Sequence, residues 1–467
     1  MATFVAASVL AAATPPAPFG PLPSERQLKW QALEGSMFIH FGVNTFTGVE
    51  WGEGTESPGI FNPGQLDCRQ WARVAKDAGL RGIVITAKHH DGFCLWPSPL
   101  TKHSVAQAPW RGGTGDVLKE LSTACRESGL GFGVYLSPWD RNNPKYGSGA
   151  EYNQYFASQL RDVLAHYGPV NEVWFDGACG EGPDGRRQTY DWPLFVSVVR
   201  ECQPGAVIFS DAGPDIRWVG NERGFGCETN WSRLSLNEFF PGIPGRNEDL
   251  CHGQRDGENW IMAEVDVSIR PGWFFRETET DKVKSVEDLK KIWLESVGRN
   301  CNLLLNVPVD RRGLIADADM ASLAGWGTAV RAMTATDIAS AAVLSAPSIR
   351  APGAAGPFDP KATVDGDPRT YFATDDAVTK CSIEYSWPTD RRPHLVRIDE
   401  AVELGQRVEA FVIETMGANG AWTAVARGTT IGARRILELP PTPCRGLRLV
   451  IESSRACPCV ARVSIYE

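Results

Sequence analysis

The sequence of 467 residues contains no apolar stretch of about 20 residues, the length that a helix needs to cross a bilayer. It also has no run of basic residues, and 56 acidic residues against 47 basic ones give a formal net charge of −9. A negative chain without a basic patch is a poor partner for nucleic acids and anionic membranes. We therefore expect neither nucleic acid nor a membrane among the partners of this protein.

Metal-binding and dinucleotide-binding patterns are missing as well. The 12 cysteines are scattered without the spacing of metal ligands, and Cys457 and Cys459 are too close together for a typical zinc pair. No glycine-rich fingerprint follows the first apolar segment, which disfavours a doubly wound dinucleotide-binding sheet. We therefore expect no metal and no cofactor. The even number of cysteines permits disulfides but does not assign them.

Residues 1–20 combine an apolar run, 4–13, with small residues after it. The pattern is similar to a secretory signal, although the basic residues that usually precede the apolar run are missing. A disordered leader is the alternative. A glycosylation sequon at Asn230 agrees with secretion. We expect a secreted, extracellular protein, located in the apoplast if the source is a plant.

Between residues 21 and 338, unbroken apolar segments alternate with amphipathic helical patterns. Unbroken apolar segments are typical of parallel strands that are buried on both faces. In 69–80, for example, apolar side chains recur at helical spacing until Gly79 ends the pattern. The expected strands are 37–42, 81–87, 131–137, 171–176, 206–211, 259–267 and 301–309, and the expected helices are 69–80, 116–130, 151–168, 192–205, 285–300 and 321–334. About seven or eight such repeats predict a (β/α)8 barrel, a TIM-like catalytic domain.

The character of the sequence changes near residue 340. Residues 346–360 are rich in proline, glycine and alanine, which is typical of a linker, and a series of short segments with strand character follows. Leu447, Leu449 and Ile451 alternate with other residues, as on a strand with one buried face. We therefore expect a C-terminal all-β sandwich at 339–467.

Catalytic groups of a (β/α)8 barrel lie at the carboxyl ends of its strands, so polar residues at those positions are candidates for a site. The 16 tryptophans, several of them in loops, suit a sugar-binding cleft because the C–H faces of a pyranose stack on indole rings. The residues at or just beyond the strand ends are His40; His89, His90 and Asp91; Tyr135, Trp139 and Asp140; Asp176; Asp211, Arg217, Trp218, Asn221 and Glu222; and Glu264, Asp266, Arg270 and Trp273.

His89 and His90 are two of only 7 histidines, and they stand side by side where an apolar segment ends. Neighbouring residues of a regular strand point to opposite faces, but at a strand end that turns at Asp91 both rings can reach one cavity. A metal site is one alternative, and a structural role for one of the two rings is another. Neutral imidazoles that donate to and accept from sugar hydroxyls fit the adjacent pair better.

Asp176 ends an apolar segment and precedes Gly177. A carboxylate in an apolar setting is costly unless it is partnered, and a simple turn-capping role is the alternative. Histidine, tyrosine and tryptophan at neighbouring strand ends favour a catalytic role. If Asp176 is the nucleophile of a retaining glycosidase, a second carboxyl group must lie about 5–5.5 Å away to protonate the leaving oxygen. Glu222, Glu264 and Asp266 are the candidates for that second group.

Seven segments in order, MFIHFG, VEWGEG, TAKHHDGFCLW, VYLSPWDRN, VWFDGA, RWVGNERG and LLNVPVDRRG, resemble the α-L-fucosidases of glycoside hydrolase family 29. The resemblance covers residues 30–335 approximately. RWVGNE and VDVSIRPGWF are similar to the subgroup, with plant members, that acts on α-1,3/1,4-linked fucose in branched glycans. The resemblance implies a retaining exo-α-L-fucosidase that uses no metal and acts on a fucosylated oligosaccharide or N-glycan.

The resemblance also implies roles for individual residues. Asp176 would be the nucleophile and Glu222 the acid/base, although this second position shifts between subgroups and Glu264 stays in contest with it. The residues that would hold the fucose ring are His40, Glu50, Trp51, His89, His90, Tyr135 and Trp273. The C-terminal region is similar to discoidin-like jelly rolls, for which we expect a packing role.

Three other functions compete with this interpretation. An α-L-fucosidase of broader specificity would share the same residues. An inactive glycan-binding barrel is possible because fold does not imply function, although the presence of both candidate carboxylates argues against it. A metal-dependent barrel hydrolase is the third.

Overall fold

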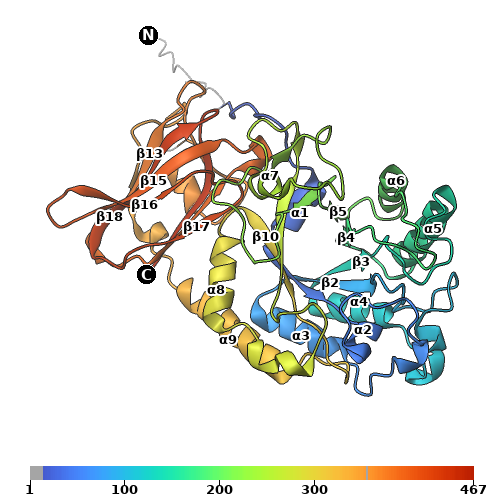
Figure 1. The fold of residues 1–467 in the computed structure, drawn as a ribbon. Helices are drawn as coiled ribbons and strands as arrows, with labels where there is room; N and C mark the ends of the chain where they lie inside the picture. Colours follow the sequence, from blue (N-terminus) through green and yellow to red (C-terminus); the bar gives the residue numbers. More distant parts are fainter. Residues whose placement is uncertain (1–13, 354–355) are drawn as a thin grey trace, which may run out of the picture. The chain divides into compact units, whose positions relative to one another are not determined.

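The computed structural model describes residues 14–353 and 356–467 (Figure 1). They form two compact units, one of Pro23–Ala332 and one of Met333–Glu467 that also includes residues 14–22. The expected leader at 1–20 lies outside the described residues as far as residue 13. Within the described ranges, no helix has the length and apolar character needed to cross a membrane.

Eight parallel strands close into a barrel in the first unit, which confirms the (β/α)8 prediction. All residues of the first two strands are buried, as the unbroken apolar segments indicated. In their order around the barrel the strands are β1 (Gly35–Ile39), β10 (Cys301–Asn306), β9 (Met262–Ser268), β6 (Ile216–Trp218), β5 (Val207–Ser210), β4 (Glu172–Trp174), β3 (Gly131–Leu136) and β2 (Gly82–Lys88).

Helices follow most of these strands and cover the barrel (Figure 1). The first of the long helices begins where the Asp67 carboxylate accepts the backbone N–H of Arg69, and it ends at Gly79, whose φ of 90° suits glycine. The long helices are α3 (Cys68–Ala78), α4 (Val117–Ser128), α5 (Ala150–His166), α6 (Trp192–Cys202), α8 (Val286–Glu295) and α9 (Asp317–Met333), and the short ones are α1 (Glu25–Gln31), α2 (Val43–Thr47) and α7 (Asn247–His252).

Arg217 and Trp218 were expected just beyond the strand 206–211 and not in a strand of their own, and this was wrong. They belong to β6, which follows β5 after residues 211–215. A three-residue strand with a central arginine has no apolar run to reveal it. The buried Arg217 guanidinium instead donates to the carbonyl of Leu250 and to Oδ1 of Asn230, both at 2.8 Å. The expected strand 259–267 is also divided, because β8 (Asn259–Trp260) pairs with β7 (Arg233–Leu234) and only β9 enters the barrel.

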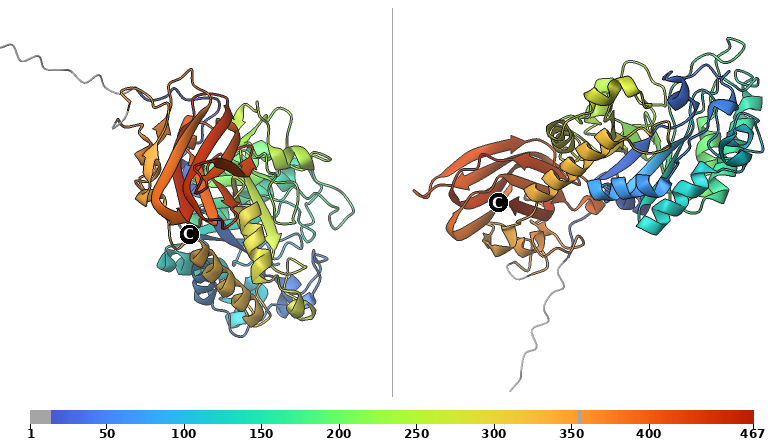
Figure 2. Two further views of the ribbon diagram at one scale, coloured as in Figure 1. Left: turned by 90° about the vertical axis from the view of Figure 1, so that its left-hand side faces the viewer. Right: turned by 90° about the horizontal axis from the view of Figure 1, so that it is seen from below.

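The second unit is an antiparallel β-sandwich, as predicted (Figure 2). Leu447, Leu449 and Ile451 are buried between its sheets, which confirms the alternation seen in the sequence. One sheet contains β11 (Val343–Ser345), β13 (Cys381–Arg391), β18 (Cys444–Ser454), β15 (Val408–Met416) and β16 (Trp422–Gly428). The other contains β12 (Phe372–Ala373), β19 (Cys459–Tyr466), β14 (Leu395–Glu400) and β17 (Arg435–Glu438).

Arg270, in the loop after β9, forms a fully buried ion pair with Asp319 of α9. Its Nε lies 3.0 Å from both carboxylate oxygens, and both side chains are 0% exposed. Arg270→Met should lower the free energy of unfolding of the barrel by about 3–5 kcal/mol, because an unpaired charge would stay buried. Denaturant unfolding followed by tryptophan fluorescence measures this loss.

The matched control is Arg69→Met, which breaks the exposed pair between Arg69 and Glu127. Exposed pairs contribute at most about 1 kcal/mol, so this variant should unfold nearly as the parent does. Equal losses in the two variants would contradict the role given to the buried pair.

Candidate active site

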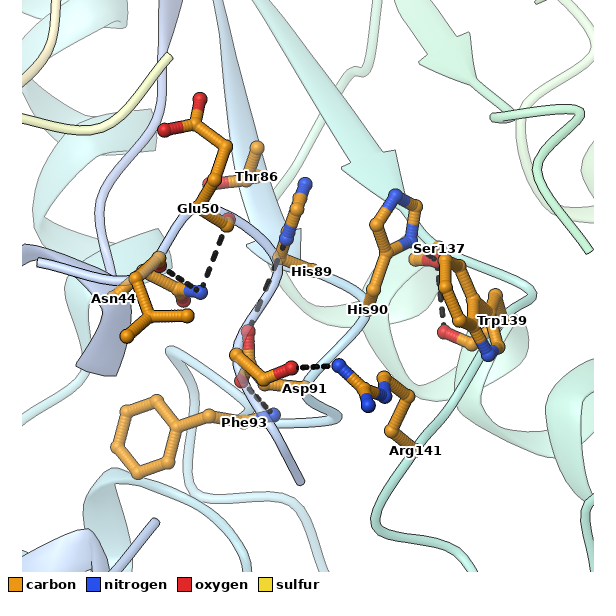
Figure 3. Close-up of polar contacts among 12 residues, drawn as sticks. Asn44, Glu50, Thr86, His89, His90, Asp91, Phe93, Ser137, Trp139 and Arg141 are labelled. Atoms are coloured by element: carbon orange, nitrogen blue, oxygen red, sulfur yellow. Dashed lines mark hydrogen bonds and ion pairs between the residues drawn. The ribbon is translucent and has the colours of Figure 1, made fainter. Parts of the chain in front are cut away.

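Three histidine rings meet at the carboxyl ends of β1 and β2. His89 and His90, which follow β2, are shown in Figure 3. The ring centroid of His89 lies 4.1 Å from that of His90 and 5.6 Å from that of His40. The two adjacent histidines therefore do reach one place, as the turn at the end of the strand allows. Burial lowers the pKa of His40 to about 3 and also lowers the pKa of His89 and of His90, so the three rings are neutral at pH 7.

Hydrogen bonds fix the tautomers of two of these rings. His40 Nδ1 lies 2.8 Å from Oδ1 of Asn306, while Nδ2 of Asn306 donates to the Trp273 carbonyl. The amide oxygen can only accept, so His40 carries its proton on Nδ1. Nε2 of His40 is left as an acceptor for a ligand hydroxyl group.

The same reasoning holds for His90, whose Nδ1 lies 2.8 Å from the Ser137 hydroxyl. That hydroxyl donates its own proton to the Trp139 carbonyl at 2.8 Å, so it must accept from His90 (Figure 3). Nε2 of His90 is again the acceptor, and it lies 3.6 Å from Oδ2 of Asp176. Neither Asn306 nor Ser137 was singled out from the sequence, although Asn306 is the polar residue that ends β10.

Asp176 follows β4 by two residues and stands among these rings. Its Oδ2 accepts a hydrogen bond from the Tyr135 hydroxyl at 3.1 Å, and its Oδ1 accepts the backbone N–H of Ala178 at 2.8 Å. The Tyr135 ring in turn stacks on His89, with 5.7 Å between centroids. The Asp176 side chain keeps 26% of its surface exposed. It is therefore held in a defined orientation while one edge stays open to a ligand.

Glu222 lies beyond β6 at the solvent-facing rim, where the Trp273 side chain donates a hydrogen bond to it. The carboxyl group is partly desolvated, and the negative charges of Asp176 and Glu50 lie close by. Desolvation first, and then these two charges, raise the pKa of Glu222. An acid with this environment stays protonated at a higher pH than an ordinary glutamate.

Glu264 and Asp266, the other candidate acids, lie inside the barrel and are buried. Glu264 accepts a hydrogen bond from Nε1 of Trp174 at 3.1 Å and shares a hydrogen bond with Glu172. Asp266 accepts from Nε1 of Trp218 at 2.8 Å. Burial raises the pKa of both carboxyl groups well above the ordinary value.

Glu50 and Trp51 lie in the loop after α2 and also contact the candidate site. Glu50 accepts the backbone N–H of Trp273 at 2.5 Å and forms an ion pair with Arg276, a residue that the sequence analysis did not single out. Trp51 is 57% exposed, and its ring stands edge-on to Trp139, with 5.7 Å between centroids. The ring centroid of Trp273 lies 5.1 Å from that of His40. All the residues expected to form the site are thus linked by contacts.

Other residues at the strand ends have structural partners instead. Asp140 pairs with the buried Lys88 at 2.9 Å. Asp91 accepts the backbone N–H of Phe93 at 2.8 Å and so turns the chain after His90, while burial raises the pKa of Asp91 to about 7 (Figure 3). Among the described residues, no group of three or more His, Cys, Asp or Glu side chains is arranged to hold a metal ion. Of the cysteines, Cys227 and Cys251 form a disulfide.

Known proteins share both the sequence and the fold of this chain. The family model for α-L-fucosidase matches residues 55–333. Alpha-L-fucosidase 1 of Arabidopsis thaliana is 40% identical over 97% of this chain and 88% of its own length. The crystal structure of SpGH29 superposes with a TM-score of 0.91 at 36% identity, over 97% of this chain and 99% of that one.

A GH29 fucosidase of Ruminococcus gnavus in complex with fucose gives a TM-score of 0.90 at 30% identity, over 97% of this chain and 96% of that one. Sequence and fold thus agree with these relatives over nearly the whole chain, and the family model agrees over residues 55–333. This chain belongs to the α-L-fucosidases of glycoside hydrolase family 29.

Proposed function

We propose that this α-L-fucosidase is a retaining exo-enzyme that releases α-1,3/1,4-linked L-fucose from branched oligosaccharides and glycoproteins. The observation that carries the proposal is the arrangement around Asp176. A partly open carboxylate is oriented by Tyr135 and lies close enough to Glu222 for its charge to raise the pKa of that acid. Two carboxyl groups on either side of a glycosidic bond are what double displacement requires.

In the proposed first step, an oxygen of Asp176 attacks the anomeric carbon of fucose. The bond to the leaving oxygen breaks with its electron pair, and Glu222 protonates that oxygen. In the second step Glu222, now a carboxylate, takes a proton from water, and this water displaces Asp176 from the anomeric carbon. Two inversions restore the original α configuration. The raised pKa of Glu222 suits its role because the acid must be protonated when the first step begins.

The neutral histidines and the aromatic rings would bind the fucose ring. Nε2 of His40 and Nε2 of His90 face the site as acceptors for sugar hydroxyls, since each Nδ1–H is already used. Trp51 and Trp273 offer apolar surface for the C–H groups and the methyl group of fucose. Tyr135 keeps its proton, because burial raises the pKa of its hydroxyl well above the ordinary value, and it remains a donor to Asp176.

The linkage preference is tested by fucose release from a branched Lewis-type trisaccharide, from linear 2'-fucosyllactose and from an aryl fucoside. We expect release from the branched sugar and little from the other two. Comparable release from all three would replace the proposed preference with a broader specificity. Release from none of them by folded protein would favour the glycan-binding alternative.

Substrates with different leaving groups distinguish the proposed roles of Asp176 and Glu222. Asp176→Asn should lower kcat/KM more than about 1,000-fold on every substrate, because no intermediate can form. Glu222→Gln should cost about 100- to 10,000-fold on the trisaccharide but much less on α-L-fucosyl fluoride, whose leaving group needs little protonation. Glu264→Gln serves as the comparison. If Glu264→Gln instead of Glu222→Gln shows this dependence on the leaving group, Glu264 is the acid/base.

The pH dependence of kcat/KM should show the effect of the Glu50 charge on the pKa of Glu222. A negative neighbour favours the protonated form of an acid, so Glu50 helps to keep the pKa of Glu222 raised. Glu50→Gln removes that charge, lowers the pKa of Glu222 and should move the alkaline limb of the profile to lower pH. Glu53→Gln, on the same loop but paired with Arg141, is the control and should leave this limb in place. A shift in the opposite direction would refute the assignment of this limb to Glu222.

A further inference from the structure

Two adjacent phenylalanines in the loop 235–246, between β7 and α7, have opposite environments. Phe239 is 2% exposed and packs in an apolar cluster with Leu234, Leu250 and Ile261, while the Arg246 guanidinium lies 4.3 Å from its ring centroid. Phe240 is 56% exposed. The loop is therefore anchored by one ring and displays the other.

The displayed ring stands at the first position of a tight turn. The backbone N–H of Ile243 donates to the Phe240 carbonyl at 3.1 Å, which closes a four-residue turn. Pro241 occupies its second position and Gly242, with a φ of 80°, its third. These are the residues that a type II turn prefers, and proline removes backbone freedom. Because the turn restricts the backbone, it holds Phe240 in its exposed position.

The same turn is docked against the loop that carries the nucleophile. The backbone N–H of Gly242 donates to Oδ2 of Asp211 at 2.7 Å. A Cβ atom on Gly242 would lie 3.2 Å from the carbonyl oxygen of Gly177, and one on Gly177 would lie 2.1 Å from Oδ2 of Asp211. Gly177 directly follows Asp176. The turn, Asp211 and the backbone after the nucleophile are therefore in close contact.

The turn that carries Phe240 lies where the part of the substrate other than fucose would be expected. An exo-enzyme encloses the terminal sugar, so the sugar that carries fucose must lie outside the fucose pocket, at the rim. A large exposed aromatic ring on a rigid turn at that rim offers a flat apolar surface to the C–H face of a pyranose. The exposed apolar area would be covered only when the oligosaccharide binds.

We propose that Phe240 is an aglycone-binding residue, which packs against the pyranose that carries the fucose or against its neighbouring branch sugar. The proposal rests on the proposed exo-fucosidase activity and adds a determinant of oligosaccharide preference to it. Phe240 contributes binding outside the fucose pocket, and it takes no part in the bond-breaking steps.

The test compares two substrates that share fucose but differ in the aglycone. A Lewis-type trisaccharide can reach Phe240, whereas α-L-fucosyl fluoride, with a single leaving atom, cannot. In Phe240→Ala, kcat/KM on the trisaccharide should fall about tenfold, mainly through KM, since part of an aromatic contact is lost. On the fluoride it should stay within about twofold of the parent value. Phe240→Trp should retain activity on the trisaccharide because it keeps an aromatic surface.

Val343→Ala, which truncates an exposed apolar side chain of the sandwich, is the matched control and should change neither value. An unchanged kcat/KM on the trisaccharide in Phe240→Ala, or an equal loss on both substrates, would overturn the proposal while leaving the fucosidase function intact. If the parent enzyme releases fucose from neither substrate, the proposed function fails and this inference fails with it.

Discussion

Closure of the parallel barrel is the constraint on which the rest of the structure depends. Because all eight strands run in the same direction, their carboxyl ends meet at one rim, and residues as distant in the sequence as His40 and Asn306 come within hydrogen-bonding distance. The rim then determines what each side chain can do. His90 is oriented by a serine that follows β3, and Asp176 by a tyrosine within β3. No single loop forms the site.

Pairs of an indole and a carboxyl group connect the barrel interior with that rim. Nε1 of Trp30 donates to Glu172, Nε1 of Trp174 to Glu264 and Nε1 of Trp218 to Asp266, while Trp273 donates to Glu222. An indole N–H can only donate, and it brings no charge of its own. It therefore donates to an acidic oxygen without adding a positive charge, whereas a lysine or an arginine would add one.

This arrangement keeps the acidic character of the site. Burial raises the pKa of the carboxyl groups below the rim, whereas the groups at the rim are more accessible to solvent. A transition state with oxocarbenium character carries positive charge on the sugar ring. An environment of acidic oxygens and neutral imidazoles favours that charge, and imidazolium rings would oppose it. The lowered pKa values of the histidines would therefore favour the proposed reaction, because neutral rings do not oppose that charge.

Much of this could be predicted from the sequence, and the failures have physical causes. Strands such as β2 were recognisable because every residue is buried, and helices such as α3 because their apolar side chains recur with helical spacing. The positions of His40, His89, His90 and Asp176 near one another could be predicted because polar residues at the ends of apolar strands are conspicuous. The strand β6 was missed because three residues with a central arginine form no apolar run.

Residues that act through a partner were harder to find. Ser137 and Asn306 contribute by fixing the protons of two histidines, and Arg276 by pairing with Glu50. Such roles depend on contacts between strand ends that are far apart in the sequence. The different positions of Glu222 and Glu264 could not be seen in the sequence either, because only the fold separates a carboxyl group at the rim from one inside the barrel.

Direct identification of the covalent intermediate tests the central claim most sharply. The Glu222→Gln variant would be mixed with α-L-fucosyl fluoride, quenched with acid and digested, and the peptides would be analysed by tandem mass spectrometry. The variant should still form the glycosyl-enzyme from this activated substrate but hydrolyse it slowly, so we expect one fucosyl group on the side chain of Asp176. A fucosyl group on another carboxylate such as Glu264, or turnover without any labelled peptide and with a β-fucose product, would contradict the account.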